Sequence, residues 1–342
     1  MKKALSILLA AVLILTLAAG CLAETAQGGG RGIVIGSLSM LNMTEEEFLT
    51  REQGKRIGLE YLEEQGAYVS VLDASKRPAT TRVVFYDRLT DMVMALQADD
   101  INNAAVPQST ADYLVAHNEK LFKRGEYHLE NADEFTKAVA YRLGVGYSFL
   151  TTEDKTGLRD EIDRAIAAMK EDGTLDALIK TYITDAVSDP EPVEFAKTEG
   201  ETIRVAITGE LPPMDYVAPD GTPAGFNTAL LAELGRRLNK NIELIQVDSS
   251  GRAAALATGT VDLVFWTSGG DGRNKGNRQT EEEHAAFLAE MEKQNTQEQE
   301  KLMRALNGGL DYEKVQNMDL PEGTVSTQPY FSDLVSLIGL KD

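Results

Sequence analysis

Few side chains in this 342-residue sequence could perform covalent or metal chemistry. The three histidines, His117, His128 and His284, have none of the spacings typical of metal ligands. The single cysteine, Cys21, lies near the N-terminus and leaves no partner for an internal disulfide. Neither a G-x-S-x-G turn nor a P-loop occurs, and no pair of acidic residues stands out from the rest. The sequence therefore indicates neither an enzyme nor a cofactor.

A second set of residues could bind a solute. Their side chains are polar or aromatic, and they lie at the end of a predicted strand or in the loop that follows one. Trp266 ends an apolar strand and could stack on an apolar or cationic ligand, with core packing as the alternative. Thr267 and Ser268 come next, and hydroxyls and turn amides of this kind receive carboxylates. Asp215 could pair with a ligand amine, with simple solvation as the alternative.

The composition limits the partners of the chain. Its net charge of −20 argues against nucleic acid and against an anionic membrane surface, since both attract basic proteins. An apolar fraction of 43% is ordinary for a globular protein, and about 320 residues after the N-terminal region suffice for two domains.

The N-terminal region has the pattern of an export signal. Lys2 and Lys3 precede an apolar run, residues 4–19, that is shorter than the roughly 20 residues of a membrane span. The following Gly20-Cys21 resembles the lipobox of bacterial lipoproteins, which implies a signal peptide of 1–20 and lipidation of Cys21, with ordinary cleavage after Ala23 as the alternative. Residues 21–32 then form a glycine-rich flexible tether.

Strand and helix patterns alternate along the rest of the chain, which predicts α/β lobes with mainly parallel sheets. Asn42 and Thr44 precede the first expected helix, whose free amides favour an anion, with plain capping as the alternative for Thr44. The expected strands are 33–35, 68–72, 101–106, 139–150, 203–207, 242–247 and 261–266. The expected helices are one that opens at 44–47, 85–96, a helix capped by Ser109 or Thr110, 158–169, 175–182, 226–238 and 252–258.

Four segments of the second half resemble type II periplasmic and extracellular solute-binding proteins of ABC transporters, in particular the receptors for polar amino acids. Residues 203–216, IRVAITGELPPMDY, are similar to the first strand and Pro-Pro-aromatic loop of that family. DGTPAGFN at 220–227 is similar to its turn into the first helix, and ALATGTVD at 255–262 to its A-L-x-x-G-x-x-D unit. QPYFS at 328–332 is similar to its first crossover between lobes. The resemblance implies a two-lobed binding fold with a hinge.

The order of the family segments is unusual in this chain. Residues 85–102 resemble a second-lobe unit and residues 158–182 resemble the C-terminal helices of the family, yet both precede the Pro-Pro strand. We interpret this order as a circular permutation, because domain termini often lie close together; two incomplete fused modules are the alternative.

The permuted interpretation sets the expected domains. They are a second-lobe-like domain at 33–140, a hinge strand and returning helices at 141–183, an acidic linker at 184–202, and a first-lobe-like domain at 203–342 with a charged helical insertion at 279–307.

The resemblance also implies site residues. It places an aromatic wall near Tyr216 and a carboxylate-binding arginine near Arg273, with Arg278 as the second choice. It places an ammonium-binding aspartate next to Pro107, where this chain has the uncharged Gln108. The expected function is a monomeric, lipid-anchored receptor outside the cytoplasm that delivers a small polar solute to an ABC permease. A ligand-sensing module for a membrane signalling partner is the alternative.

Overall fold

The computed structural model describes residues 32–38, 45–71, 79–185, 193–218, 220–269, 297–306 and 320–341. Residues 33–342 form one compact unit, and the predicted signal peptide, Cys21 and nearly all of the tether lie outside the described residues. Among the described helices, none is both long and apolar enough to cross a membrane.

One sheet is built around the first described strand. Its order is β3-β1-β4-β16-β5, with parallel pairing of β1 to β3 and β4, and antiparallel pairing of β16 to β4 and β5. The strands are β1 (Ile33–Leu38), β3 (Thr80–Tyr86), β4 (Asn103–Pro107), β5 (Leu121–Lys123) and β16 (Val335–Leu340), and β2 (Tyr68–Ser70) pairs separately with β6 (Gly125–Tyr127).

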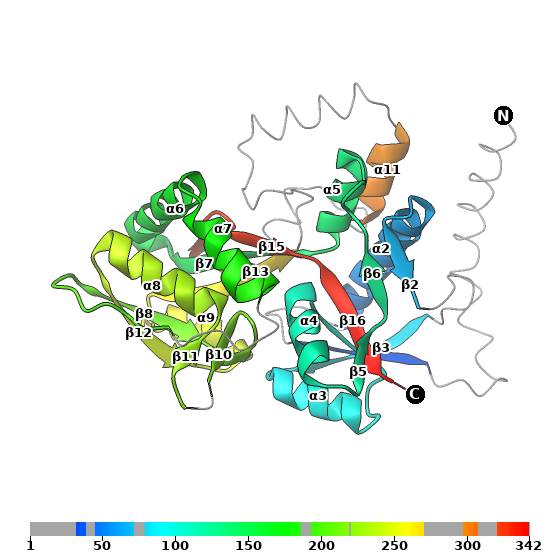
Figure 1. The fold of residues 1–342 in the computed structure, drawn as a ribbon, viewed down its shortest axis with the longest axis horizontal. Helices are drawn as coiled ribbons and strands as arrows, with labels where there is room; N and C mark the ends of the chain where they lie inside the picture. The colour runs from blue at the N-terminus through cyan, green and yellow to red at the C-terminus, as the bar shows by residue number, and fades with distance from the viewer. Residues whose placement is uncertain are drawn as a thin grey trace, which may run out of the picture. The chain divides into compact units, whose positions relative to one another are not determined.

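Helices cover both faces of this sheet (Figure 1). The side chains of α3 (Leu89–Gln97) and α4 (Gln108–His117) share one core with Ala104 and Ile338 of the sheet. Phe48 of α2 (Glu45–Glu64) packs in another core with Ile35 and Val83. We call this sheet and its helices the β1 lobe.

The second sheet has the order β12-β8-β13-β7-β14, and β15 also pairs with β7. β8 is parallel to β12 and β13, whereas β7 is antiparallel to β13, β14 and β15. The strands are β7 (Val145–Thr152), β8 (Thr202–Ile207), β12 (Asn241–Gln246), β13 (Leu263–Gly269), β14 (Thr324–Ser326) and β15 (Phe331–Asp333).

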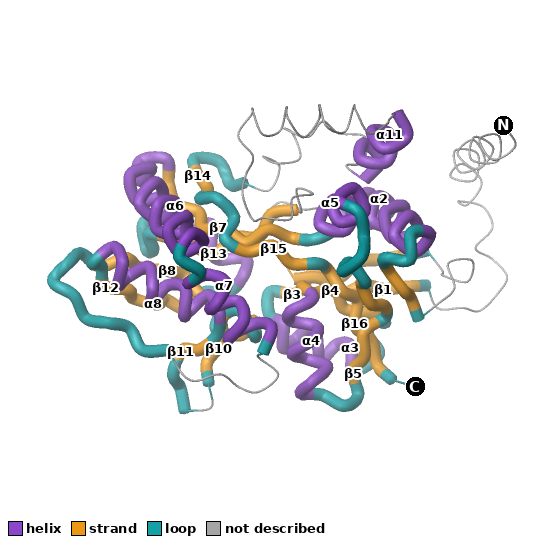
Figure 2. The backbone as a smooth tube through the Cα atoms, turned by 45° about the horizontal axis from the view of Figure 1, so that its top comes forward, coloured by secondary structure: helices purple, strands orange, loops and turns teal. Residues whose placement is uncertain are grey.

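Alternation along β13 divides its side chains between the two faces of this sheet. Leu263 and Phe265 join the core under α6 (Thr156–Glu171), α7 (Thr174–Ile179) and α8 (Phe226–Leu238). Val264 and Trp266 join the core under α9 (Arg252–Ala257). Figure 2 shows α6 and α8 along one side of these strands. We call this sheet and its helices the β8 lobe.

The two lobes confirm the α/β fold class, with each sheet mixed: a parallel set is completed by antiparallel strands. In both lobes the earliest strand of the parallel set, β1 or β8, lies in its middle. Among the stretches that the structure describes without a gap, two pass between the lobes: the one from α5 (Glu134–Arg142) into β7, and the one from β15 into β16.

Three local predictions were wrong. Phe85 lies in β3, because its apolar neighbours pair with β1 before the helical period begins at Leu89. The expected strand at 139–150 is the end of α5 followed by β7, since Gly144 separates two apolar runs. Neither Ser109 nor Thr110 caps α4, which begins directly after Pro107.

The predicted insertion at 279–307 is described only at α11 (Gln297–Leu306). Leu302, Met303 and Leu306 pack against a core that contains Leu62 of α2. The apolar positions of α11 therefore pack on the β1 lobe, although the sequence places this helix between strands of the β8 lobe.

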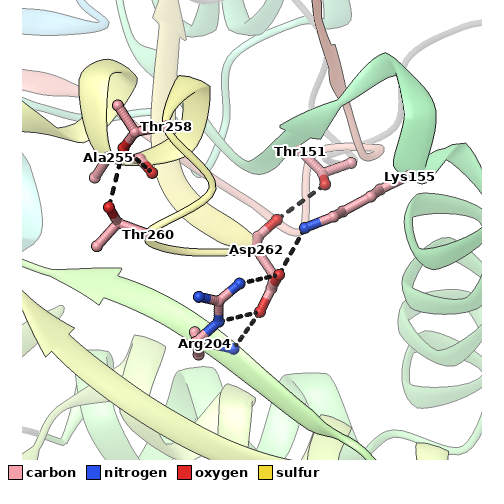
Figure 3. A network of polar contacts seen from close by, with 7 residues as sticks. All are labelled: Thr151, Lys155, Arg204, Ala255, Thr258, Thr260 and Asp262. Atoms are coloured by element: carbon pink, nitrogen blue, oxygen red, sulfur yellow. Dashed lines mark hydrogen bonds and ion pairs between the residues drawn. The ribbon is translucent and has the colours of Figure 1, made fainter.

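Asp262 joins three strands of the β8 lobe (Figure 3). Its carboxylate accepts hydrogen bonds from the main chain and guanidinium of Arg204 at 2.9–3.0 Å and from Lys155 Nζ at 2.6 Å. The Thr151 hydroxyl donates to the Asp262 main-chain oxygen at 2.9 Å. Partial burial acts to raise the pKa of Asp262, but the Arg204 and Lys155 hydrogen bonds outweigh it and lower the pKa to about 2.

We expect Asp262→Asn to lower the free energy of unfolding by roughly 1.5–3 kcal/mol in urea titrations at pH 7, because charge-assisted hydrogen bonds are lost. The folded-state pKa is lowered, so this stability is present above about pH 4 and is lost as the pH falls toward 2. The matched control is Asp160→Asn, which removes an exposed pair with Arg159 and should change stability by less than about 0.5 kcal/mol. Equal effects of the two variants would contradict this role.

Candidate functional site

The loop after β8 is shaped by a buried carboxylate. Asp215 is 2% exposed, and its Oδ2 accepts hydrogen bonds from the Thr208 amide, the Thr208 hydroxyl and the Gly209 amide at 2.8–3.0 Å. Burial raises the pKa of Asp215, and the nearby Arg252 opposes that shift. These three donors hold the loop that continues through β9 (Glu210–Leu211) and β10 (Asp215–Val217).

On one side this loop contacts the β1 lobe through Glu210, which is held by Arg88 and Thr90; we call these three residues the clamp. Arg88, just before α3, donates through Nε to Glu210 Oε2 at 3.0 Å and pairs with Glu210 Oε1 through its terminal nitrogen. Thr90 adds a hydroxyl donor to the same carboxylate at 3.2 Å. The Leu211 side chain packs against the cores of both lobes. The loop thus bridges the lobes through charge and apolar contact together.

On the other side the loop meets α4. The Tyr216 ring centroid lies 6.0 Å from that of Tyr113, and Met214 Sδ lies 4.0 Å from Ser109 Oγ. Ser109 in turn donates its amide and hydroxyl to Asp333 Oδ2 at 3.0 and 2.6 Å. The carboxylate is therefore fixed where β15 passes into β16.

Two pockets flank the loop, and residues from both lobes line each of them. The clamp pocket, about 420 Å³, has Arg88 and Asp87 on one wall and Asp248 and Arg252 on the other. The hinge pocket, about 430 Å³, lies between the start of α4, the Pro213 loop and the β15–β16 passage, and its lining includes Gln108, Tyr113, Tyr141, Thr184, Ser332 and Asp333.

The clamp pocket contains a guanidinium with an unused donor. Arg252 Nη1 donates to the Phe265 main-chain oxygen at 3.2 Å, while its buried Nε has no hydrogen-bond partner among the described residues. Burial lowers the pKa of Arg252, and the neighbouring Asp215 opposes that shift. The pocket therefore carries both signs of charge.

The hinge pocket contains a buried carboxylate with neutral donors. Asp333 is 9% exposed, and its other oxygen, Oδ1, accepts the Leu334 amide at 2.8 Å. Burial raises the pKa of Asp333 to about 6, although the Ser109 hydrogen bonds act in the opposite direction. None of the described residues forms an ion pair with it.

The residues predicted from sequence divide among several environments. Tyr216 is 9% exposed and its ring lies 6.0 Å from that of Tyr113 on α4, whereas Gln108 lines the hinge pocket. Asp215 has its Oδ2 occupied by three loop donors. Trp266 is 7% exposed and packs in the core under α9.

The other predicted residues are less fully placed. Thr267 is half-buried and pairs with Tyr147 across β13 and β7, and the main chain of Ser268 pairs with Gly146. Asn42, Thr44, Arg273 and Arg278 lie outside the described residues. All these site residues stay predictions.

Sequence reasoning missed Asp333, Tyr113, Arg88, Glu210 and Arg252. The position of Asp333 after the crossover-like QPYFS segment was an available signal, since it puts a carboxylate at a lobe boundary. The pairing of Arg88 with Glu210 had no local signal, because 122 positions separate the two residues. Within the described part of the chain, no three His, Cys, Asp or Glu side chains gather closely enough to hold a metal ion.

Residues 203–311 match the family model for bacterial extracellular solute-binding proteins, family 3. This segment runs from β8 to just past α11 and is about a third of the chain. The match confirms the resemblance to extracellular solute-binding proteins, and that family consists of binding proteins rather than enzymes. No curated protein matches the sequence significantly.

Solved structures give only remote similarities. They include the ligand-binding component of an ABC-type import system from Staphylococcus aureus with zinc bound, at 10% identity and TM-score 0.38, covering 91% of this chain and 66% of that one. The protein AgaA from A. tumefaciens R10 in complex with agropinic acid is 13% identical, with TM-score 0.34 and coverages of 76% and 55%. The periplasmic aliphatic sulphonate binding protein SsuA from Escherichia coli is 13% identical, with TM-score 0.30 and coverages of 87% and 86%. This chain spans less than two thirds of the first two proteins, and these TM-scores assign no ligand.

We expect the raised pKa of Asp333 to make folding depend on pH. The folded state holds this proton more tightly than the unfolded state, so the contribution of Asp333 to stability falls by about 2–3 kcal/mol as the pH rises from about 4 to 7. Urea unfolding of the wild type and Asp333→Asn at both pH values measures this change as the difference between the two proteins.

The groups around Asp333 allow a matched control. They are Asp112 of α4 and the tyrosines 127, 141 and 147, and burial raises the pKa of each tyrosine above its ordinary value near 10, far from this range. Asp112 is half exposed and pairs with Lys123, so Asp112→Asn should keep most of the pH dependence of the wild type. A stability difference between wild type and Asp333→Asn that stays constant with pH would contradict the raised pKa.

Proposed function

We propose that this chain is an extracytoplasmic, lipid-anchored solute-binding protein of an ABC-type uptake system. It captures a small polar solute, an amino acid or a related compound, in the cleft between the β1 and β8 lobes. The observation that carries the proposal is the cleft itself: two pockets lined by both lobes, on either side of the loop after β8. The family match of residues 203–311 supports binding as the activity.

The geometry supports capture by closure. The linings come from the carboxyl ends of β1, β3, β4, β8 and β12, where open α/β sheets bind ligands. Only the α5–β7 and β15–β16 passages connect the lobes along the described chain, so bending there opens or closes the cleft. A solute held by groups from both lobes stabilises the closed arrangement, which then docks on an ABC permease.

The chain order supports a circular permutation. Each sheet contains a strand that the chain enters from the other lobe. This strand is β7 in the β8 lobe and β16 in the β1 lobe, and each pairs antiparallel with a strand of the parallel set. A chain that began at β8 and continued through β16 into β1 would end at α7, with the order that the family resemblance implies. The present linker at 184–202 would then join the family's usual ends, and the new ends would lie beside β1 and β16.

The remaining parts of the proposal rest on sequence. A signal peptide at 1–20 directs export, lipidation of Cys21 anchors the monomeric chain, and the tether at 21–32 separates it from the membrane. The proposed domains are 33–140 and 203–342, with β7 added to the second and β16 to the first, because these strands complete the sheets of the β8 and β1 lobes.

Thermal unfolding of the purified protein against amino acids, amines, organic acids and short peptides tests the proposal. A solute with Kd near 1 μM, present at 1 mM, should add about 4 kcal/mol of stability and raise Tm by roughly 6 °C. Tyr113→Ala should lower the affinity for that solute at least about tenfold, because it removes an aromatic side chain from the lining of the hinge pocket.

Tyr61→Ala is the matched control, since Tyr61 of α2 pairs with Thr136 outside the cleft. It should lower Tm without changing the affinity. The absence of any bound solute across the panel, or equal affinities for wild type and Tyr113→Ala, would contradict the proposed site.

A further inference from the structure

We propose that the β1 lobe has a binding site of its own, a cavity between α2 and the sheet that takes a monocarboxylate with an apolar chain, such as a fatty acid of medium length. We call it the α2 cavity. It has a volume of about 300 Å³, at the lower end of the range for ligand pockets. It shares no lining residue with the clamp pocket or the hinge pocket, so the proposal goes beyond the proposed function and does not rest on it.

The α2 cavity lies at the end of the sheet away from the cleft. Among its lining residues, Ile33, Thr80 and Asn103 are the first residues of β1, β3 and β4. The two cleft pockets are lined instead by residues at the other ends of these strands, such as Leu38 of β1 and Gln108 after β4. The length of the strands therefore separates the two places, and each can hold a ligand of its own.

The floor of the α2 cavity is apolar. Side chains alternate along a strand, so the lining residues of β1, β4 and β16 share one face of the sheet: Ile33, Ile35, Ala105, Val335 and Leu337. The residues between them face the core under α3 and α4. β4 lies between β1 and β16, and its Ala105 has the smallest of these side chains, which leaves space at the middle of the floor.

The roof of the α2 cavity interrupts an otherwise apolar helix face. Residues at spacings of four, three, four and three positions form one face of α2: Phe48, Glu52, Lys55, Leu59 and Leu62. Phe48 at one end and Leu59 and Leu62 at the other pack in two separate cores. Between them, Glu52 and Lys55 line the cavity and pair at 3.1 Å, with side chains that are 17% and 31% exposed. Charged residues at core-facing positions indicate a function other than packing.

The charges around the α2 cavity favour an anion. Its lining contains three basic side chains, those of Lys55, Arg56 and Arg124, and one acidic side chain, that of Glu52. Glu60 lies outside the lining and approaches Arg56 at 3.7 Å. Basic residues therefore outnumber acidic ones here, although the chain as a whole has a net charge of −20.

Arg124 is held on the floor of the α2 cavity. Its Nε donates to Asn103 Oδ1 at 2.9 Å, and its guanidinium carbon lies 4.5 Å from the centroid of the Phe122 ring. A Cβ atom at Gly339 would collide with the guanidinium, so the glycine leaves room for it. Gly339 is on the same face of β16 as Leu337, which places the guanidinium beside the apolar floor. A planar guanidinium matches the geometry of a carboxylate.

These features specify the two parts of the ligand. The apolar floor takes a hydrocarbon chain, and the basic side chains take a single anionic group at one end of it. A small inorganic anion lacks the first part, and a neutral hydrocarbon lacks the second. Octanoate has both parts and is therefore the probe for this site.

Isothermal titration of the purified protein near neutral pH tests the proposal. Octanoate should bind at one site, and butanoate should bind at least about tenfold more weakly, because it buries less apolar chain. Octanol and octylammonium keep the chain but lack the carboxylate, so each should also bind at least about tenfold more weakly than octanoate.

Two variants test the floor and the charge separately, so one remains informative if the other fails to fold. Ala105→Leu fills the space and should weaken octanoate at least about tenfold without lowering Tm, since filling a cavity adds apolar contacts. Arg124→Met should weaken octanoate at least about tenfold, because it removes the charge on the floor. Arg159→Met is the matched control: it removes the same charge from a pair with Asp160 in the β8 lobe and should change the affinity less than about threefold.

The outcomes separate this site from the cleft. Failure of octanoate to bind, or equal affinities for octanoate and octanol, would overturn the proposal. Tyr113→Ala alters the cleft and should leave octanoate binding within about threefold of wild type; a loss as large as that in Ala105→Leu would place octanoate in the cleft and also overturn the proposal. None of these results bears on the capture of a polar solute between the lobes, which the thermal-unfolding panel tests by itself.

Discussion

The structure depends on the short passage from β15 to β16. Asp333 pairs with Val145 in the sheet of the β8 lobe, and Val335 pairs with Pro107 in the sheet of the β1 lobe. Only Leu334 lies between these pairings, so one peptide segment belongs to both sheets. Its oxygen accepts from the Gln108 amide, and the Asp333 carboxylate accepts from the Ser109 amide and hydroxyl, so the start of α4 in the β1 lobe holds this segment. Main-chain pairing on each side leaves little freedom at this point other than bending.

The cleft follows from that constraint. With the lobes joined there, the loop after β8 meets both α3 and α4, and it divides the space into two pockets of similar size. The pockets have different electrostatic characters because different elements reach them: arginines before α3 and in α9 line one, and the carboxylate of the passage lines the other.

The same passage brings remote parts of the chain into one sheet. β16 pairs with β4, and β4 is parallel to β1, so the first and the last described strands belong to the same lobe. The apolar packing of α11 on α2 shows similar independence from sequence order, since the helix lies on the lobe opposite to its neighbours in the chain.

The local pattern of apolar and polar residues determined much of the secondary structure of this protein. Apolar runs and glycine breaks predicted most of the helices and the parallel strands, and short motifs predicted a solute-binding fold. The pattern also put polar residues at strand ends, and one of them, Gln108, is part of the lining of the hinge pocket. These features depend on neighbours in sequence, so a single sequence contains them. The errors at Phe85 and at 139–150 arose where a strand and a helix follow each other closely and their apolar residues form one continuous pattern.

Only the tertiary structure decided which polar groups meet. Asp333 reaches Ser109 across 224 positions, and Arg88 reaches Glu210 across 122, and no spacing rule connects such distant residues. It also decided that Trp266 packs in a core and that Asp215 holds a loop, because the same side chain can face a cleft or an interior according to the register of its strand. The sequence by itself therefore determined the α/β fold class, the resemblance to solute-binding proteins and the approximate ends of most strands. The charge of each pocket was set by packing, which brings together residues that are remote along the chain.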